Sequence, residues 1–417
     1  MKKIFFILLI SPLLLIGQQT VTLSDCYGFL NQNYPLIKKQ ALLEAQSEVQ
    51  KDAIRTSNLP RIELNGQATY QSEVIQFPLE IPGMTVEPLN NDQYRATIDI
   101  FQPIYNGGAV NSSIALSTAE SAIKQQEAAV SLYQLKAKIN YYYISILLLQ
   151  ERENLFGDKL KQLNLKLKEL EIAVANGVAL AKVEKSLKAE RIQIEQELIA
   201  VRASWAQLLK QLSQLTYNEI NDNAVLERPT FLNTELAPRP ELKLFELQSQ
   251  KLSLSQELNS STRKPTLNAF GQLGYGNPGL NMLENAFTEY YLVGVKLKWN
   301  IFDWNKVKKT NKSLSFAREM VAVEQSIFEV NNEMQLTEAT AEMEKIKQLI
   351  QSDLSLITLR DDIVKISDSE LENGAITASL YLDDLTDLYE AKSKKATHEM
   401  QLTLAEANYY LLKGITP

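Results

Sequence analysis

The sequence contains one cysteine, Cys26, and one histidine, His398, in 417 residues. A single cysteine cannot form an internal disulfide, and these two residues offer little for thiol chemistry or a metal site. Nothing in the sequence assembles a nucleophile, a base and a group that orients them. An enzyme is therefore the least supported function class, and we assign no catalytic, cofactor-binding or metal-binding residue.

Proline is absent from two long stretches, residues 104–228 and 279–416, so the chain has few points at which a helix must end. Pro229, Pro238 and Pro240 lie near the middle and indicate a linker at residues 229–238. The net charge is −7 with both signs interspersed, which provides no basic surface for a nucleic-acid partner.

Long hydrophobic runs are also missing, except near the start of the chain. Lys2-Lys3, an apolar run at residues 4–16 and Gly17 are typical of a signal peptide, predicted at residues 1–17. This run is short for a membrane-spanning helix, which needs about 20 residues. No later segment is apolar enough for such a helix, so a mature protein that enters a membrane would have to do so as strands. Lipidation of Cys26 is not expected, because Asp25 stands where a small residue is required.

What the chain does contain is helix-forming sequence of unusual length. Residues 109–177 hold no proline, and leucines recur there at alternating spacings of three and four, which is typical of a coiled-coil seam. At about 1.5 Å per residue, such a helix would be roughly 100 Å long. A second stretch of the same kind runs from residue 306 to Asn373-Gly374.

Short segments with strand periodicity precede both long helices. After a predicted helix at residues 22–57, apolar and polar residues alternate strictly from Arg61 to Tyr70, and again from Tyr94 to Ile100. These segments predict a β-hairpin at about residues 61–101, with strands long enough to cross a bilayer when they are tilted. A matching hairpin is predicted at about residues 266–299.

The two halves of the chain repeat one order of elements. Pro60 and Pro265 lie 205 positions apart, whereas the Asn-Gly pairs at 176–177 and 373–374 lie 197 apart, which indicates a shorter second hairpin loop. We therefore predict a first repeat at residues 18–228 and a second at 239–417, joined by the linker. Each consists of helix, hairpin, very long helix, tight turn and returning helix.

Four strands cannot close a barrel around a lumen, but three copies of the chain would supply twelve. Aromatic residues cluster at the strand ends, where a membrane barrel carries its interfacial girdle: Tyr70, Tyr94, Phe101, Tyr105, Tyr275, Tyr290, Trp299, Phe302 and Trp304. The alternative is a small soluble sheet packed on a helical bundle. In a barrel, the polar strand faces would line the lumen, with Arg61, Glu63, Asn65, Gln67, Arg95, Asp99, Lys296 and Lys298.

The order and spacing of these elements resemble the TolC-like outer-membrane efflux family. The resemblance rests on residues 23–35, on the segment from Gln102 to Gly108, on the two Asn-Gly tips, and on residues 373–392. It implies a homotrimer in the lipid of the Gram-negative outer membrane, with a twelve-stranded barrel above a twelve-helix periplasmic tunnel. It also implies that the helix tips engage a periplasmic adaptor protein of an inner-membrane pump.

The same resemblance implies candidate site residues near the tips. Asp383, with Asp384 and Asp387 nearby, matches the position of an acidic ring at the family's constriction, although Leu380 replaces another member of that ring. The alternative is an ordinary solvated helix face. The adaptor-docking candidates are the two tips, which are alternatively ordinary helix turns: Asn176, Gly177, Val178, Asn373, Gly374 and Ala375.

Two apparent motifs are set aside. The glycines at 274, 276 and 279 satisfy a dinucleotide-binding pattern, but the preceding strand alternates and no parallel βαβ unit follows. His398 is expected at the surface. The favoured function is the exit duct of an efflux pump or type I secretion system, and the rivals are a periplasmic adaptor and a structural coiled-coil envelope protein. The sequence indicates no cargo.

Overall fold

The computed structural model describes residues 20–75, 88–221, 224–231 and 238–415. The predicted signal peptide and residues 232–237 of the predicted linker lie outside these ranges. The chain forms two compact units. Unit 1 comprises the chain up to Lys38, Ala129–Pro240 and the chain from Phe328, whereas unit 2 comprises Lys39–Ala128 and Glu241–Ile327.

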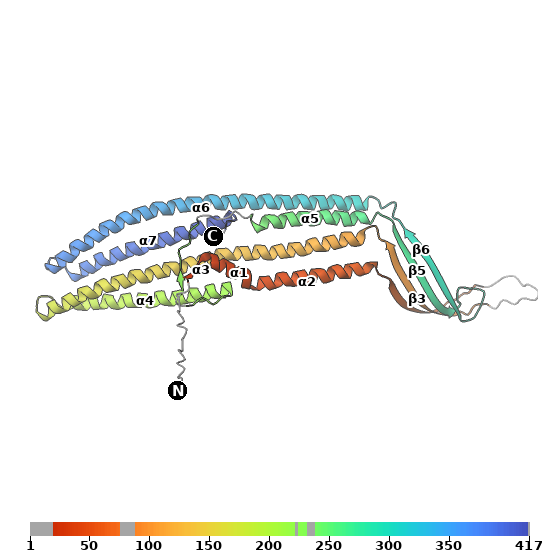
Figure 1. Ribbon diagram of the computed structural model, residues 1–417, viewed down its shortest axis with the longest axis horizontal. Coiled ribbons are helices and arrows are strands. Elements are labelled where there is room, and N and C mark those ends of the chain that lie inside the picture. Colours follow the sequence, from red (N-terminus) through yellow and green to blue (C-terminus); the bar gives the residue numbers. More distant parts are fainter. Residues whose placement is uncertain (1–19, 76–87, 222–223, 232–237, 416–417) are drawn as a thin grey trace, which may run out of the picture. The chain divides into compact units, whose positions relative to one another are not determined.

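Most of the described residues are helical (Figure 1). None of the helices in the described ranges is both long and apolar enough to span a membrane. The helices are α1 (Leu23–Asn33), α2 (Pro35–Arg55), the 3₁₀ turn η1 (Thr56–Asn58), α3 (Ala109–Ala175), α4 (Ala181–Thr216), α5 (Pro240–Ser261), α6 (Lys306–Glu372) and α7 (Ala378–Leu412). The strands are β1 (Thr20–Val21), β2 (Arg61–Tyr70), β3 (Asp92–Tyr105), β4 (Val225–Leu226), β5 (Thr266–Asn277) and β6 (Thr288–Lys298).

The first predicted helix is two helices. Thr22 and Asp25 form a capping box that starts α1. The helix then ends at Tyr34, whose backbone is extended (φ −65°, ψ 141°), and α2 begins at Pro35. The prediction of one helix over residues 22–57 was therefore wrong, because the proline ring disfavours a helical conformation of the preceding residue.

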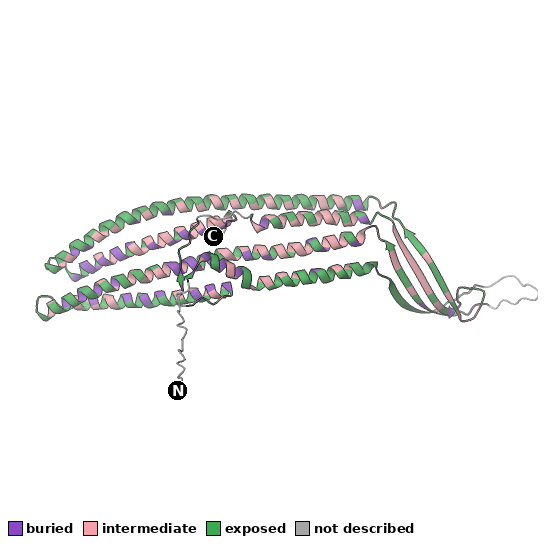
Figure 2. Cartoon of the chain, in the orientation of Figure 1, coloured by how far each residue is buried: buried purple, intermediate pink, exposed green. Residues whose placement is uncertain are grey.

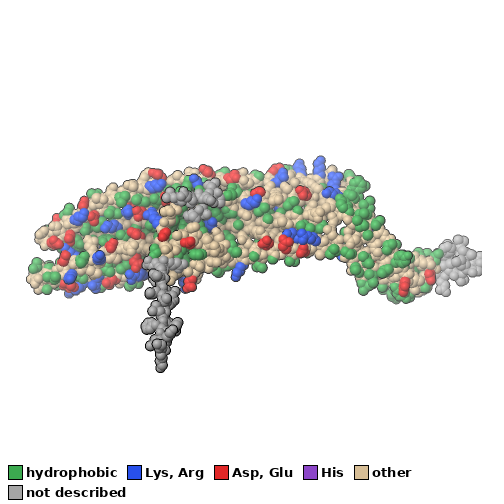
Figure 3. Space-filling view, viewed as in Figure 1, with side chains coloured by type: hydrophobic (Ala, Val, Ile, Leu, Met, Phe, Trp, Pro, Cys, Tyr) green, Lys and Arg blue, Asp and Glu red, His purple; other side chains and the backbone are tan. Residues whose placement is uncertain are grey.

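In unit 2, the four long strands form one antiparallel sheet in the order β2-β3-β5-β6. Strand β3 continues through Pro103 to Tyr105, with an irregularity between them, so pairing extends past the predicted end at Phe101. Residues of one parity are mainly apolar, and Figure 3 shows hydrophobic side chains gathered over the sheet. Within the described residues, the outer edges of β2 and β6 are unpaired.

The two hairpins have the same register. Arg61 faces Phe101 in the first hairpin, and Thr266 faces Lys298 in the second. Thr266 lies 205 residues after Arg61, and Lys298 lies 197 residues after Phe101, so the two pairs are equivalent in the repeat. The helix–strand junctions also match. The Gln102 side chain donates to the carbonyl of Asn58 at 2.8 Å, and the Trp299 indole donates to that of Arg263 at 3.0 Å.

Equivalent turns follow β3 and β6, but they use different residues. Gly107 and Gly108 have positive φ values of 69° and 84°, and their equivalents Trp304 and Asn305 have 51° and 62°. Glycine adopts this left-handed conformation without strain, whereas a tryptophan does so at a cost of roughly 1–2 kcal/mol.

The described residues of unit 1 form two separate hydrophobic clusters. Figure 2 colours the buried positions along these helices. The mid-chain cluster joins α1, β1 and β4 to parts of α3, α4 and α7, and it includes Leu212 and the fully buried Cys26. Burial, assisted by the charge of Asp25, raises the pKa of the Cys26 thiol to about 12, as expected for a small core residue. The tip cluster joins α3, α4, α6 and α7 around Leu163, Leu187 and Leu385.

His398 is not a surface residue. Its side chain is 13 % exposed, and its Nδ1 lies 2.6 Å from Oδ2 of Asp353 on α6. The prediction of a surface histidine was wrong because α7 packs this position toward α6, a contact between helices that the local sequence does not reveal.

Candidate functional site

The polar residues predicted to line a lumen share one face of the sheet. Glu63 faces Asp99, and Gln67 faces Arg95 across β2 and β3, whereas Lys296 and Lys298 lie at the same parity on β6. Side-chain alternation along paired strands fixes this arrangement. Whether the face is wet depends on assembly, so its role as a lumen stays a prediction.

Asp99 is the centre of a hydrogen-bonded group on this face. Its carboxylate accepts from Asn65 Nδ2 at 2.7 Å, from Thr97 Oγ1 at 2.8 Å and from Gln272 Nε2 at 2.5 Å. Thr97 and Gln272 were not among the candidates from the sequence, although they have the same parity as the residues that were. Three charge-assisted hydrogen bonds from three strands fix the position of this carboxylate.

The other charged groups of this face are less well satisfied. Glu63 lies directly opposite Asp99, a like-charged cross-strand pair that is unfavourable by itself. Across the described ranges, Glu63, Lys296 and Lys298 form no ion pair. Arg61 beside Glu63 on β2 and Arg95 on β3 also form no ion pair in the described ranges, so the face carries charges of both signs without partners.

Aromatic rings cover glycines on the same polar face. A Cβ at Gly274 would lie 2.1 Å from Cζ of Tyr290, and one at Gly294 would lie 2.7 Å from Cζ of Phe270. Tyr290 faces Gly274 across the strand pair, so it lies on the polar face. Phe101 also lies on the polar face, because it faces Arg61. The expected place of Tyr290 and Phe101 among the girdle residues was therefore wrong, because side chains of a girdle face the lipid and not the polar side of the sheet.

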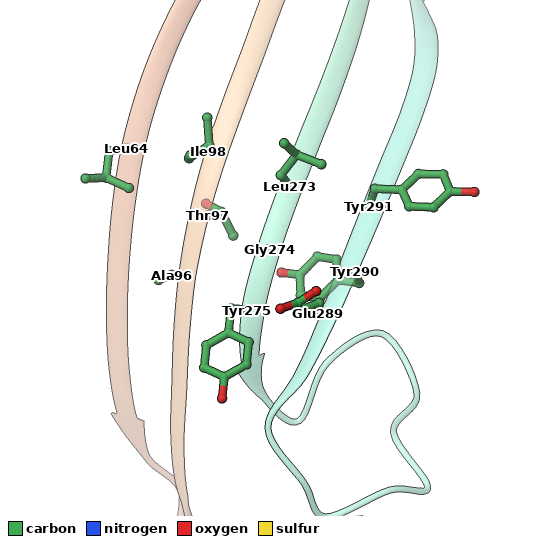
Figure 4. Close-up of a pocket in the computed structure, with 10 residues that line it drawn as sticks. All are labelled: Leu64, Ala96, Thr97, Ile98, Leu273, Gly274, Tyr275, Glu289, Tyr290 and Tyr291. Atoms are coloured by element: carbon green, nitrogen blue, oxygen red, sulfur yellow. The ribbon is translucent and has the colours of Figure 1, made fainter.

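The apolar face carries a continuous row of side chains across all four strands. Leu64, Ile98, Leu273 and Tyr291 are successive cross-strand partners from β2 to β6 (Figure 4). They help to line a hollow of about 640 Å³. Near the loop end of the sheet, Phe287 stacks on Tyr94 and on Tyr275, with ring centroids 6.3 and 5.5 Å away.

The three acidic gate candidates on α7 differ in their partners. Asp387 forms an ion pair with Arg360 of α6 at 2.8 Å, and Asp384 accepts a hydrogen bond from Ser367 of α6. Asp383 is exposed, and among the described residues it has no hydrogen-bonding or ion-pairing partner. Two of the three carboxylates are therefore engaged by the neighbouring helix, and among the described residues only Asp383 of the three has no such partner.

The two docking tips have one backbone geometry. Gly177 has a φ of 71° and donates to Val174, while Val178 donates back to Ala173 at 2.8 Å. In the second tip Gly374 has a φ of 69°, and Ala375 donates to Glu370 at 2.8 Å. Both are Schellman turns, in which a left-handed glycine ends the helix and the last carbonyls are satisfied.

The side chains of the tips differ. Val178 and Leu180 of the first tip are 82 % and 75 % exposed. Their equivalents in the second tip are Ala375 and Thr377, and the Thr377 hydroxyl caps the start of α7. A cleft of about 710 Å³ lies between the tips, lined by apolar residues of both and by Glu169, Lys182 and Glu372.

Beside this cleft, Lys166 of α3 links the helical hairpin of α3 and α4 to that of α6 and α7. Its ammonium lies 2.7 Å from Asp368 and 3.0 Å from Glu372 of α6, and 3.2 Å from Glu169. Burial alone would lower the pKa of Lys166, but these hydrogen bonds outweigh burial and raise that pKa above its usual range. The group is therefore a charged link between α3 and α6 at every physiological pH.

Residues 27–216 match the family model described as Outer membrane efflux protein. In structure the chain is similar to the outer-membrane protein VceC from Vibrio cholerae, with 14 % identity, coverage of 94 % of this chain and 96 % of that one, and a TM-score of 0.65. It is similar to a membrane protein from Pseudomonas aeruginosa, with 15 % identity, 96 % and 91 % coverage and a TM-score of 0.68. It also resembles the CmeC outer-membrane channel from Campylobacter jejuni, with 13 % identity, 94 % and 85 % coverage and a TM-score of 0.64.

No curated protein matches the chain in sequence. At the identities of the solved structures, the likeness shows the fold, which is the mostly helical fold of TolC-like outer-membrane channels. Together with the family match over residues 27–216, it confirms the resemblance that the sequence indicates.

Proposed function

We propose that this protein is the outer-membrane exit duct of a tripartite efflux pump or a type I secretion system in a Gram-negative envelope. The observation that carries the proposal is the fold, which matches solved outer-membrane channels over more than nine tenths of the chain. The duct conducts passively and performs no catalytic step. If the protein were an adaptor, a sheet with one apolar face would have no role. If it were a structural coiled coil, both β-hairpins would be unexplained.

The duct is a homotrimer in this proposal. A four-stranded sheet with one apolar face has two unpaired edges, which are not tolerated in a bilayer. Three copies give twelve strands and can close a barrel without edges. The repeats, residues 18–228 and 239–417, then supply six similar sectors of one ring, with the polar face of each sheet toward the lumen.

An exposed apolar stripe on the helices of unit 2 supports assembly. Phe316, Met320, Val323 and Ile327 follow one another on α6 at spacings of four, three and four, and each is more than half exposed. Leu42 and Val49, seven residues apart on α2, are 70 % and 71 % exposed. Heptad stripes of this kind pack against other helices.

The tips are the proposed contact with a periplasmic adaptor and, through it, with an inner-membrane pump that supplies the energy. The apolar side chains of Val178 and Leu180 beside the tip cleft suit the end of another helical hairpin. The predicted signal peptide, residues 1–17, would direct export.

The test is the mass and conductance of the protein extracted from envelope membranes in mild detergent. We expect a trimer that forms ion-conducting pores in planar lipid bilayers. A water-soluble monomer without pore activity would overturn the proposal and favour the adaptor or the coiled-coil interpretation.

Asp383 is the residue with which to test the constriction. Replacing Asp383 with alanine is expected to raise single-channel conductance or to weaken cation preference, because three symmetry-related carboxylates would face one another across a narrow lumen. The same measurement on Glu197→Ala, an exposed carboxylate on α4 of the other hairpin, is the control. If conductance and selectivity are unchanged in Asp383→Ala, this carboxylate has no gate role.

A further inference from the structure

The polar face of the sheet also carries apolar side chains, which interrupt its alternating pattern. Phe101 faces Phe270 across β3 and β5. Leu292 faces Gln272 across β5 and β6, so all three apolar residues lie at the parity of Asp99. Phe101 and Leu292 are 36 % and 44 % exposed. On a face that the proposed function places in water, exposed apolar groups are unfavourable, and a group of them is a candidate binding surface.

The ring of Phe270 reaches across β6. The cross-strand partner of Phe270 is Gly294, and a Cβ at Gly294 would lie 2.7 Å from Cζ of the ring. Because glycine has no side chain, the ring can cover the strand at this point, as aromatic rings cover glycines in other sheets. Phe270, Phe101 and Leu292 together form what we call the apolar floor.

A fixed carboxylate lies beside the apolar floor. Asp99 is two positions from Phe101 on β3 and faces Gln272, the partner of Leu292. The side chains that donate to Asp99 come from Asn65, Thr97 and Gln272, and all three are neutral. They hold the carboxylate in place without cancelling its charge. Since a carboxylate can accept about four hydrogen bonds, Asp99 retains capacity for a further donor.

These groups line one hollow of about 430 Å³ on the polar face. The lining also includes Glu63, which faces Asp99, and Arg61, which faces Phe101. Neither Glu63 nor Arg61 forms an ion pair within the described ranges. The hollow thus combines an apolar floor with two carboxylates and one guanidinium group, and its net charge is negative.

We propose that this hollow binds aromatic organic cations on the wall of the duct. The positive group of such a molecule lies against the Asp99 carboxylate, and its ring packs on Phe270 and Phe101, whose ring faces also attract a cation. An inorganic cation makes no use of the apolar floor, and an aromatic anion is repelled by the carboxylates. The inference rests on the proposed function and deepens it by naming a ligand class.

Two lysines of the same face lie outside the hollow. Lys296 and Lys298 follow Gly294 on β6, and neither is among the described residues that line the hollow. The carboxylates therefore determine which sign of charge the hollow accepts, and the ammonium groups border it on one side.

A second contact between a ring and a glycine extends the apolar floor toward the loop end of the sheet. Tyr290 covers Gly274 as Phe270 covers Gly294, and Leu292 lies between these two contacts on β6. An aromatic molecule can therefore move along β6 from one ring to the next without leaving an apolar surface.

Saturation-transfer NMR with benzyltrimethylammonium tests the site in the protein extracted from envelope membranes. We expect the wild-type protein to bind this cation more tightly than benzenesulfonate, an aromatic anion, and than tetraethylammonium, a cation without a ring. Asp99→Asn is expected to weaken the binding of benzyltrimethylammonium about fivefold, which is the effect of losing an exposed ion pair. Phe270→Leu is expected to weaken it about threefold, because a cation–π contact is lost.

Glu289→Gln and Tyr291→Leu are the matched controls, because both residues lie on the opposite face of β6. Both variants should bind with wild-type affinity. Equal affinities of the wild-type protein for the aromatic cation and the aromatic anion would overturn the inference, and so would an affinity that Phe270→Leu leaves unchanged.

Two further readouts keep the outcomes distinct. Asp99 joins three strands, so if Asp99→Asn does not assemble, Phe270→Leu decides by itself. A wild-type protein that forms no pores would contradict the proposed function, whereas normal pores without selective binding would contradict the binding site alone.

Discussion

Replacing both Met320 and Ile327 with glutamate is expected to leave the chain folded and to abolish its assembly into conducting pores. Both side chains lie on the exposed stripe of α6, at 60 % and 56 % exposure, so a single copy loses little when they become charged. In an assembled ring the same positions lie between helices. Each ring would then bury six carboxylates without partners, at a cost of several kcal/mol for each seam.

Three measurements check this expectation. Circular dichroism should show unchanged helix content, sedimentation in detergent should show monomers, and planar-bilayer recordings should show pore activity reduced at least a hundredfold. The matched control, Met320→Leu with Ile327→Val, keeps the stripe apolar and should assemble normally. Normal trimers in the glutamate variant would mean that this face of α6 is not a subunit contact.

Replacing Leu385 with alanine is expected to destabilise the tip region by about 2–5 kcal/mol, the cost of deleting a fully buried leucine and leaving a cavity. Leu385 is 0 % exposed in the tip cluster, which also holds Tyr381 and Leu388 of α7. Because the mid-chain cluster is separate, the loss should be local. Hydrogen exchange should become faster around residues 378–390 and stay unchanged around residues 139–147.

The mid-chain cluster offers a matched comparison. Leu212 is also fully buried, so Leu212→Ala should cost a similar free energy but accelerate exchange around residues 139–147 first. If both variants accelerate exchange equally in both regions, unit 1 unfolds as one cooperative body. The tips would then have no independent stability.

Elements governed by local periodicity could be predicted from the sequence. Strict alternation from Arg61 to Tyr70 predicts a strand, and this segment is β2. The break at Tyr34 could also have been predicted, because Pro35 carries a sufficient local signal.

Features that depend on how two helices meet could not be predicted. The partners of His398, Asp387 and Asp384 on α6 are Asp353, Arg360 and Ser367. These three partners are spaced seven residues apart, which places them on one face of α6, but no pattern in α7 indicates which of its residues they meet. The resemblance placed Asp383 at the acidic-ring position and Asp384 and Asp387 nearby, but it did not indicate that α6 engages the latter two.

The shared register of the two hairpins has a consequence for how a ring could form. A ring of six sectors built from single repeats would require six chains to meet, and its formation would depend steeply on protein concentration. Covalent linkage of two sectors makes every second junction, such as β3 with β5, intramolecular, with a high effective concentration of its partner. Only three junctions between chains then remain, and two association steps are enough to complete them.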